Sequence, residues 1–194
     1  NDDTRYFNDN FQALPKEGYS KMIERMLDHK NINVYLNTPY HKGLGSKYEH
    51  AFLCIPIDEF YQFKYGILPY RSIIFRDVLE DSYKQSAPVI NFTDDSIYTR
   101  KTQWNLFPNS PAKRSNLSTI TYEKPCSIEE NTGEYYYPVK TRNSKIIYEN
   151  YRRLSKLQDK ITFCGRTGLF KYIDMIPAVN IHLKLANDFL IGQK

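Results

Sequence analysis

The sequence predicts a mixed α/β (α+β) protein in which an antiparallel β-sheet is inserted into a discontinuous α/β domain of the nucleotide-binding type. Two patterns lead to this prediction. The outer parts of the chain alternate short apolar runs with helical patterns, whereas the middle contains strand-like runs joined by short polar linkers. A sheet domain inserted into a discontinuous outer domain explains both patterns simply.

The first part of the outer domain is expected at residues 1–58. A helix is predicted at residues 20–29, because its apolar side chains fall on one face, and Ser20 is a candidate N-cap. Residues 33–36 and 51–57 are predicted to be strands. Pro56 lies inside the second run and has no amide hydrogen, so backbone pairing there should be incomplete.

The inserted sheet is expected at residues 59–125, as a substrate-binding domain. Strand-like runs cover residues 70–79, 88–92, 97–107 and 117–122. Short links between successive strands favour an antiparallel meander. The outer domain then resumes at residues 126–194, with a helix capped by Asn143, a strand at 161–164 and a helix at 174–190.

Composition and charge exclude several classes of protein. The chain has 194 residues, of which 41% are hydrophobic and 25% charged, as in folded domains. The net charge is +5, but the basic residues are dispersed, which favours a few phosphate-contacting arginines over a nucleic-acid-binding stripe. No apolar run is long enough to predict a membrane span.

The cysteines and histidines do not predict a metal site. The three cysteines are far apart in the sequence, and neither they nor the four histidines show the paired spacing of zinc ligands. Reduced thiols in a cytoplasmic protein are the simplest interpretation.

The most informative segment is residues 160–175. A strand meets Gly165 and Arg166 in a glycine-containing turn, and a helix begins near Asp174. Such a unit can present backbone N–H groups and the positive end of a helix dipole to an anionic ligand. Strand–glycine–helix units also occur as plain packing, and Asp174 is as well explained as an N-cap. Both alternatives remain open at this stage.

Three further side chains are candidates for contact with a phosphorylated ligand. Arg100 lies in a predicted strand, from which a guanidinium can hold a phosphate with two hydrogen bonds. Tyr137 and Tyr172 each carry a hydroxyl that can donate to a phosphate oxygen. The alternatives are an arginine at a sheet edge and half-buried aromatic residues. No set of nucleophile, base or paired carboxylates stands out, which suits a protein whose cofactor carries the chemistry.

A series of short motifs, taken together and in order, resembles the UDP-galactopyranose mutase family. They span nearly the whole chain, and as a set they are specific. The motifs are Tyr-Phe-Asn-Asp at 6–9, Leu-Pro-Lys-Glu-Gly-Tyr at 14–19, Pro-Ile-Asp at 56–58, Phe-Lys-Tyr-Gly at 63–66, Leu-Pro-Tyr-Arg-Ser at 68–72, Tyr-Thr-Arg at 98–100, Glu-Lys-Pro at 123–125, Tyr-Tyr-Pro-Val at 136–139, Gly-Arg at 165–166 and Tyr-Ile-Asp-Met at 172–175.

The resemblance implies a flavoenzyme that interconverts UDP-galactopyranose and UDP-galactofuranose for cell-surface polysaccharide synthesis. In that family the cofactor is reduced FAD, whose N5 attacks the anomeric carbon and displaces UDP, and the flavin–sugar adduct opens and recloses as the furanose. No side chain is therefore assigned as catalytic. The implied substrate-binding residues are Arg100, Tyr137 and Tyr172, and the implied cofactor-binding residues are Gly165, Arg166, Asp174 and Met175.

The resemblance covers only the C-terminal half of the family. The Gly-x-Gly-x-x-Gly fingerprint of dinucleotide binding does not occur in these residues, so the 194 residues alone are expected to be inactive. Ile55 stands where the family usually has glycine, and Phe11 where it often has tyrosine. These departures leave open a diverged, non-catalytic sugar-nucleotide-binding relative. A basic nucleic-acid-binding sheet protein is a third hypothesis, which the dispersed charge disfavours. No membrane partner is expected, and a homodimer is left open.

Overall fold

The computed structural model describes residues 9–45, 47–81, 85–108, 110, 117–131 and 133–192. The chain forms two compact units. One comprises Asn1–Pro39, Val78–Val89 and Thr102–Ile120, and the other comprises Tyr40–Asp77, Ile90–Lys101 and Thr121–Lys194. Helices and both parallel and antiparallel strand pairs occur, so the predicted mixed α/β class is confirmed. Residues 6–8 of the first resemblance motif lie outside the described residues.

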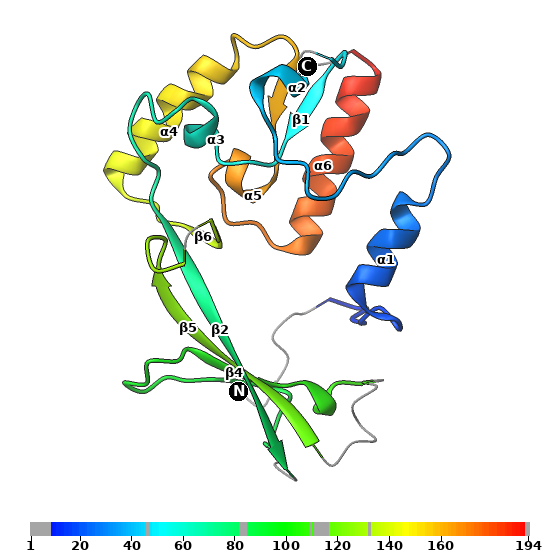
Figure 1. Cartoon of the computed structure of the whole chain (residues 1–194), viewed down its shortest axis with the longest axis vertical. Helices are drawn as coiled ribbons and strands as arrows, with labels where there is room; N and C mark the ends of the chain where they lie inside the picture. Colours follow the sequence, from blue (N-terminus) through cyan, green and yellow to red (C-terminus); the bar gives the residue numbers. More distant parts are fainter. Residues whose placement is uncertain are drawn as a thin grey trace. The chain divides into compact units, whose positions relative to one another are not determined.

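A two-stranded parallel sheet lies at the centre of the second unit. Strand β1 (Ala51–Leu53) pairs with β7 (Ile161–Phe163), with Leu53 opposite Phe163. Figure 1 shows these strands between helices α4 (Arg142–Ser155) and α6 (Met175–Leu190). Strand β1 is shorter than predicted, because Pro56 takes the N-cap position of the next helix, α3 (Ile57–Phe60). Two short helices, α2 (Lys42–Gly45) and α5 (Gly165–Gly168), also belong to this unit.

The core of this unit is a cluster of aromatic and aliphatic side chains. It consists of Leu53, Ile57, Leu68, Tyr70, Tyr151, Phe163 and Phe170. Tyr151 of α4 is fully buried. Its hydroxyl donates to the Gly66 carbonyl at 2.8 Å and accepts the Tyr65 amide at 2.9 Å. Both polar requirements of the buried phenol are therefore met.

Helix α4 begins one residue before the predicted cap. Thr141 is the N-cap, because its hydroxyl accepts the amide of Ser144 while the Ser144 hydroxyl accepts the amide of Thr141. This reciprocal capping box satisfies two donors at the helix start. The prediction of Asn143 as the cap is therefore wrong, since Asn143 lies within the first turn.

The second sheet has five strands, in the order β3-β4-β5-β2-β6. The strands are β2 (Tyr70–Asp81), β3 (Val89–Asn91), β4 (Arg100–Gln103), β5 (Leu117–Ser127) and β6 (Tyr137–Pro138). A simple meander is therefore wrong in one respect, because β2 lies beside β5 and not beside β3. The two longest strands together form a longer hydrogen-bonded ladder than β2 can form with the three-residue β3. The predicted strand at 97–107 ends early in a 3₁₀ turn, η1 (Trp104–Leu106).

The first unit contains helix α1 (Gly18–Leu27), which confirms the helix predicted at 20–29. Glu17 takes the N-cap position without a side-chain hydrogen bond, so the prediction of Ser20 as the cap is wrong. The strand predicted at 33–36 is also wrong. These residues form an irregular segment in which Tyr35 and Leu36 are largely exposed, without a strand partner among the described residues.

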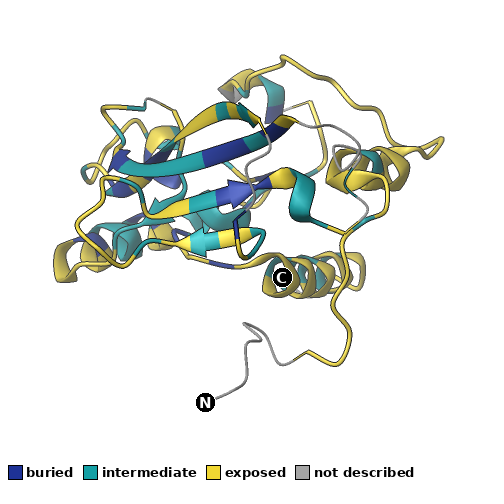
Figure 2. Cartoon of the chain, turned by 90° about the horizontal axis from the view of Figure 1, so that it is seen from below, coloured by how far each residue is buried: buried dark blue, intermediate teal, exposed yellow. Residues whose placement is uncertain are grey.

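Helix α6 matches its predicted position closely and is only partly covered. Its side chains Ile181, Leu185 and Phe189 are half-buried, and Phe189 packs against Phe52 of β1. Figure 2 shows that much of this helix, beside the C-terminus, is exposed. The exposed apolar side chains of α6 are Met175, Ile176, Val179, Leu183 and Leu190.

Candidate functional site

Three of the predicted site residues meet in the second unit. Arg166 comes from α5, Tyr137 from β6 and Tyr172 from the segment before α6. The Arg166 guanidinium carbon lies 4.7 Å from the centre of the Tyr172 ring and 5.9 Å from that of Tyr137. The two rings stack with their centres 5.4 Å apart. A planar cation on aromatic faces is favourable, so these residues form one arginine–tyrosine cluster.

Backbone carbonyls hold the arginine of this cluster. Arg166 Nη1 donates to the carbonyl of Tyr136 at 2.8 Å, and Nη2 donates to the carbonyl of Ile173 at 2.9 Å. These carbonyls belong to two separate segments of the chain, so the guanidinium ties them together. Hydrogen bonds from a charged donor are stronger than neutral ones. The position of Arg166 is therefore set by the fold.

Tyr172 and Asp174 interact in front of helix α6. A hydrogen bond to the Asp174 carboxylate, together with partial burial, raises the pKa of Tyr172 above its ordinary value. The Tyr172 hydroxyl is therefore held beside the Asp174 carboxylate. Asp174 stands at the N-cap position in extended conformation, but its side chain makes no capping hydrogen bond. The carboxylate thus acts on Tyr172 instead of closing the helix.

The start of α6 offers two backbone donors. The amides of Met175 and Ile176 belong to the first turn, where helix geometry supplies no partner, and Pro177 has no amide hydrogen. The first helical hydrogen bond runs from the amide of Ala178 to the carbonyl of Asp174, at 2.9 Å. Met175 is 63% exposed. This donor set, at the positive end of a helix dipole, suits an anionic group.

Gly165 and Gly168 are explained by packing. Gly165 has φ +70°, and its amide donates to His182 Nε2 at 2.8 Å. A Cβ at Gly168 would lie 2.8 Å from the Leu53 carbonyl oxygen of β1. Only glycine lets α5 approach the strand this closely. The amide of Gly165 is therefore used inside the protein, and this part of the turn follows the packing alternative.

Arg100 lies on β4 with partners of its own. Its Nε donates to Asn91 Oδ1 at 3.1 Å, and Nη1 lies 3.5 Å from Glu123 Oε1. The side chain is half-exposed. Among the described residues, Arg100 contacts these two side chains and does not join the arginine–tyrosine cluster. The family resemblance groups it in one substrate-binding set with Tyr137 and Tyr172.

The sequence alone did not single out three residues beside the glycine turn. His182 accepts the Gly165 amide, and Cys54 and Cys164 lie with their sulfur atoms 3.2 Å apart. A signal for the cysteines was present, because Cys54 and Cys164 each lie in a run predicted to be a strand. Parallel pairing of those runs brings the two thiols side by side.

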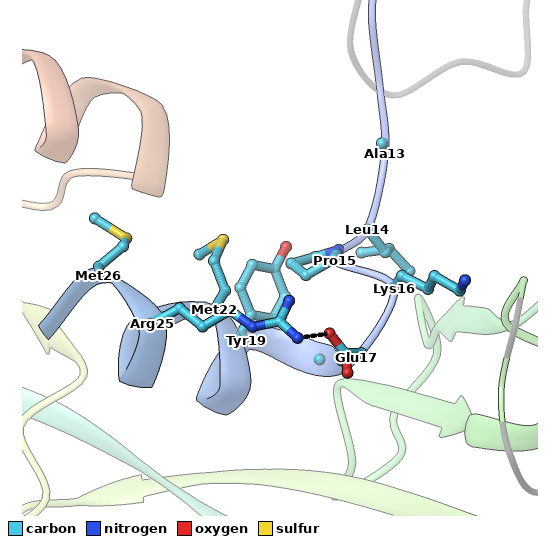
Figure 3. A pocket seen from close by; sticks show the side chains of 10 residues that line it. Ala13, Leu14, Pro15, Lys16, Glu17, Tyr19, Met22, Arg25 and Met26 are labelled. Atoms are coloured by element: carbon cyan, nitrogen blue, oxygen red, sulfur yellow. Dashed lines mark ion pairs between the residues drawn. The ribbon is translucent and has the colours of Figure 1, made fainter. Parts of the chain in front are cut away.

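A surface hollow of about 660 Å³ lies along α1 and the segment before it (Figure 3). Its walls come from residues 13–26, and Arg25 forms an ion pair with Glu17 at its edge. Tyr19, Met22 and Met26 line it but are all exposed. The hollow contains none of the predicted site residues, so we assign it no role in catalysis.

No three His, Cys, Asp or Glu side chains within the described residues are grouped as metal ligands. None of the helices in that part of the chain is long and apolar enough to cross a membrane.

Comparison with known proteins identifies the family. The family model described as UDP-galactopyranose mutase matches residues 1–172. This match covers most of the chain, which therefore belongs to the UDP-galactopyranose mutase family.

Individual relatives agree with this assignment. The chain is 33% identical over 191 residues to a probable UDP-galactopyranose mutase of Klebsiella pneumoniae, covering 98% of this chain and 49% of the relative. It is 27% identical to a dTDP-fucopyranose mutase of Escherichia coli, covering 100% of this chain and 53% of the relative. A UDP-galactopyranose mutase of Mycoplasma pneumoniae is also 27% identical, over 92% of this chain and 48% of the relative. The chain thus spans about half the length of these relatives.

Proposed function

We propose that this chain is the C-terminal portion of a flavin-dependent mutase that interconverts UDP-galactopyranose and UDP-galactofuranose. The observation that carries the proposal is the family match over residues 1–172. In this proposal residues 1–58 and 126–194 belong to a discontinuous, Rossmann-like FAD-binding domain, and residues 59–125 bind the substrate. The mutase activity belongs to a protein about twice as long, as the relatives are.

The donors at the start of α6 fit the cofactor that the family implies. When bound, reduced FAD supplies the nucleophile of the reaction. The amides of Met175 and Ile176, with the helix dipole, favour the negatively charged N1–C2 edge of the reduced ring. Asp174 leaves these amides open, because its side chain does not cap them. Gly165 contributes indirectly, because its amide donates to His182 of α6 and joins the turn to that helix.

The arginine–tyrosine cluster and Arg100 bind the substrate in this proposal. Tyr172 donates its hydroxyl to a diphosphate oxygen in place of the Asp174 carboxylate, which accepts that hydrogen in the structure. Arg166 holds the rings of Tyr137 and Tyr172 in a fixed stack. Arg100 contacts the diphosphate from β4 through Nη2, because Nε and Nη1 already contact Asn91 and Glu123.

The non-catalytic alternative has weaker support. It depends on Ile55 and Phe11, which replace family residues. The Ile55 side chain packs against the protein's own core cluster, which weakens the argument that it crowds a cofactor. Phe11 is 83% exposed. We therefore favour a catalytic mutase.

The full-length protein provides the test. We expect it to bind FAD, and after dithionite reduction to convert UDP-galactofuranose into UDP-galactopyranose, as followed by chromatography of the nucleotides. dTDP-fucopyranose is the comparison substrate, since one relative carries that name. Binding of FAD without turnover of either substrate would favour the non-catalytic alternative, and absence of FAD would contradict the proposal.

The 194 residues alone should behave differently. We expect weak or no binding of FAD, because the dinucleotide fingerprint is absent from them. We also expect self-association, since α6 exposes Met175, Val179 and Leu183 on its surface. Light scattering and flavin absorbance measure both properties. The cytoplasmic location and the homodimer remain predictions.

A further inference from the structure

A pair of thiols lies where β1 and β7 end. Cys54 and Cys164 follow Leu53 and Phe163, which are opposite each other in the parallel register. Their sulfur atoms are 3.2 Å apart, although the residues are separated by 110 positions in the chain. Adjacent strands lie about 4.7–4.9 Å apart, and disulfides join Cα atoms about 4.4–6.8 Å apart. A disulfide between these cysteines therefore requires little movement of the backbone.

The two cysteines differ in exposure. Cys54 is exposed, whereas Cys164 is buried, as is the third cysteine, Cys126. Oxidants in solution therefore reach Cys54 first. Gly165, next to Cys164, leaves space for the Cys54 side chain, because a Cβ there would lie 3.0 Å from the Cys54 sulfur. The pair thus has one accessible sulfur and one sheltered partner in contact with it.

The surroundings of Cys54 and Cys164 shift the pKa values of the two thiols in opposite directions. A hydrogen bond from Cys164, with a smaller contribution from His182, lowers the pKa of Cys54 to about 6. The same contact and burial raise the pKa of Cys164. His182 Nε2 accepts the Gly165 amide, so its other nitrogen, Nδ1, carries the hydrogen and donates to the Ala178 carbonyl. The hydrogen bond from Cys164 is the largest cause of the lowered Cys54 pKa.

We propose that Cys54 and Cys164 form a peroxide-sensitive thiol pair, with Cys54 as the attacking residue and Cys164 as the resolving residue. The Cys54 thiolate attacks one oxygen of hydrogen peroxide, the O–O bond breaks, and hydroxide leaves and takes up a proton. The Cys164 thiol then attacks the sulfenic sulfur of Cys54, so that an S–S bond forms, the S–O bond breaks and water leaves. In sum, two thiols and one peroxide give one disulfide and two water molecules, and a dithiol reverses the reaction.

The disulfide would join the end of β1 to the start of α5. Thr167 of α5 already donates its hydroxyl to the Cys54 carbonyl at 2.8 Å. Oxidation would add a covalent bond between the same two segments, which hydrogen bonds alone hold in the reduced protein. This site does not depend on the proposed mutase activity, because it involves only these side chains and an external peroxide. Failure of one proposal therefore leaves the other standing.

Peptide mapping of the full-length protein tests the pair directly. Trypsin separates the cysteines into peptides 48–64 and 161–166. After brief treatment with hydrogen peroxide and alkylation of the remaining thiols, we expect these peptides to appear joined, two hydrogen masses below their sum, and to separate again with dithiothreitol. Cys126→Ser is the matched control and should leave the joined product unchanged.

Two variants assign the roles. In Cys164→Ala, peroxide should leave a sulfenic acid on Cys54 that dimedone traps, and the pH at which Cys54 reacts half-maximally with iodoacetamide should rise from about 6 towards the ordinary value. In Cys54→Ser, Cys164 should react little with hydrogen peroxide, because it is buried. The proposal is overturned if the wild-type protein yields no joined peptides, if Cys54 links only between two molecules, or if Cys54 alkylates no faster than Cys126.

Discussion

The turn at Gly165 and the turn at Asp174 belong to one segment that the sequence predicts to face a ligand. In the folded protein their hydrogen-bond donors are used differently. At Gly165 the amide is taken by His182, and at Gly168 the missing side chain lets α5 touch β1. At Asp174 and Met175 the helix start is uncapped by side chains and exposed. The first turn is therefore a packing element, whereas the second has donors to offer a ligand. A strand–glycine–helix pattern alone does not separate these cases, because it records which residues are present and not which hydrogen bonds they have already made.

The largest effect should follow removal of Arg166, which links the two turns. Arg166→Ala leaves the carbonyls of Tyr136 and Ile173 without their charged donor. Allowing for partial exposure, we expect a loss of about 2–4 kcal/mol in the free energy of unfolding, measured by denaturant titration. Arg166→Lys should recover only part, since it cannot form both bonds in one plane. Arg153→Ala is the control, because that side chain is mostly exposed and should change stability by about 0.5 kcal/mol or less. Equal effects at the two sites would contradict a structural role for Arg166.

Next in size is Gly168→Ala. The new Cβ would lie 2.8 Å from a backbone oxygen of β1, so the strand or α5 must shift. We expect a loss of about 2–3 kcal/mol, seen as a lower melting temperature. Gly43→Ala adds a methyl group at an ordinary distance of 3.5 Å from His41 and should be nearly neutral. If Gly168→Ala melts like the wild type, the packing account of the first turn is wrong.

A third prediction concerns Arg100 in the full-length enzyme. Arg100→Ala should cost about 1.5–3 kcal/mol at the diphosphate contact, and hence tenfold or more in kcat/KM. Stability should change little, because its ion pair with Glu123 is partly exposed. Lysine should restore part of the rate. Arg76→Ala removes an exposed arginine of the same sheet and serves as control. Unchanged kinetics would make Arg100 a surface residue of the sheet edge.

The smallest effect on stability, but a measurable one on the flavin, is expected for Met175→Pro. The first helical position does not use its amide within the helix, and the extended backbone of Asp174 (φ −79°, ψ 170°) suits a residue before proline. The melting temperature should stay nearly constant, while loss of a donor to the reduced ring lowers the flavin reduction potential and slows turnover. Potentiometry of the full-length variant measures this change in the flavin reduction potential. An unchanged potential in a folded variant would rule out the proposed contribution of the second turn.

Much of the fold was predictable where a pattern acts locally. The helix expected at 174–190 is found at Met175–Leu190, and the strand expected at 161–164 at Ile161–Phe163, because the period of apolar side chains reports which face a segment buries. Caps were less predictable. Asn143 and Thr141 both have capping side chains, and only the reciprocal bonds with Ser144 select Thr141.

The candidate site was predictable in part. Arg166, Tyr137 and Tyr172 were all singled out, and they do meet. Their shared stack was not foreseen, since it depends on β6 lying beside the segment before α6. Arg100 was grouped with them by resemblance, yet its contacts are with Asn91 and Glu123. A motif indicates the type of residue at a site and leaves open which neighbours that residue contacts.

The sequence by itself determined where most helices and strands lie, the class of fold and the family to which the chain belongs, because these depend on local periodicity and on the order of motifs. The tertiary structure alone decided that β2 lies beside β5, that β1 pairs with β7, and that Cys54 meets Cys164 across 110 residues of chain. Such pairings are selected by the burial and hydrogen bonding of the whole assembly of strands. No single segment encodes them, because each strand presents the same backbone donors and acceptors to any partner.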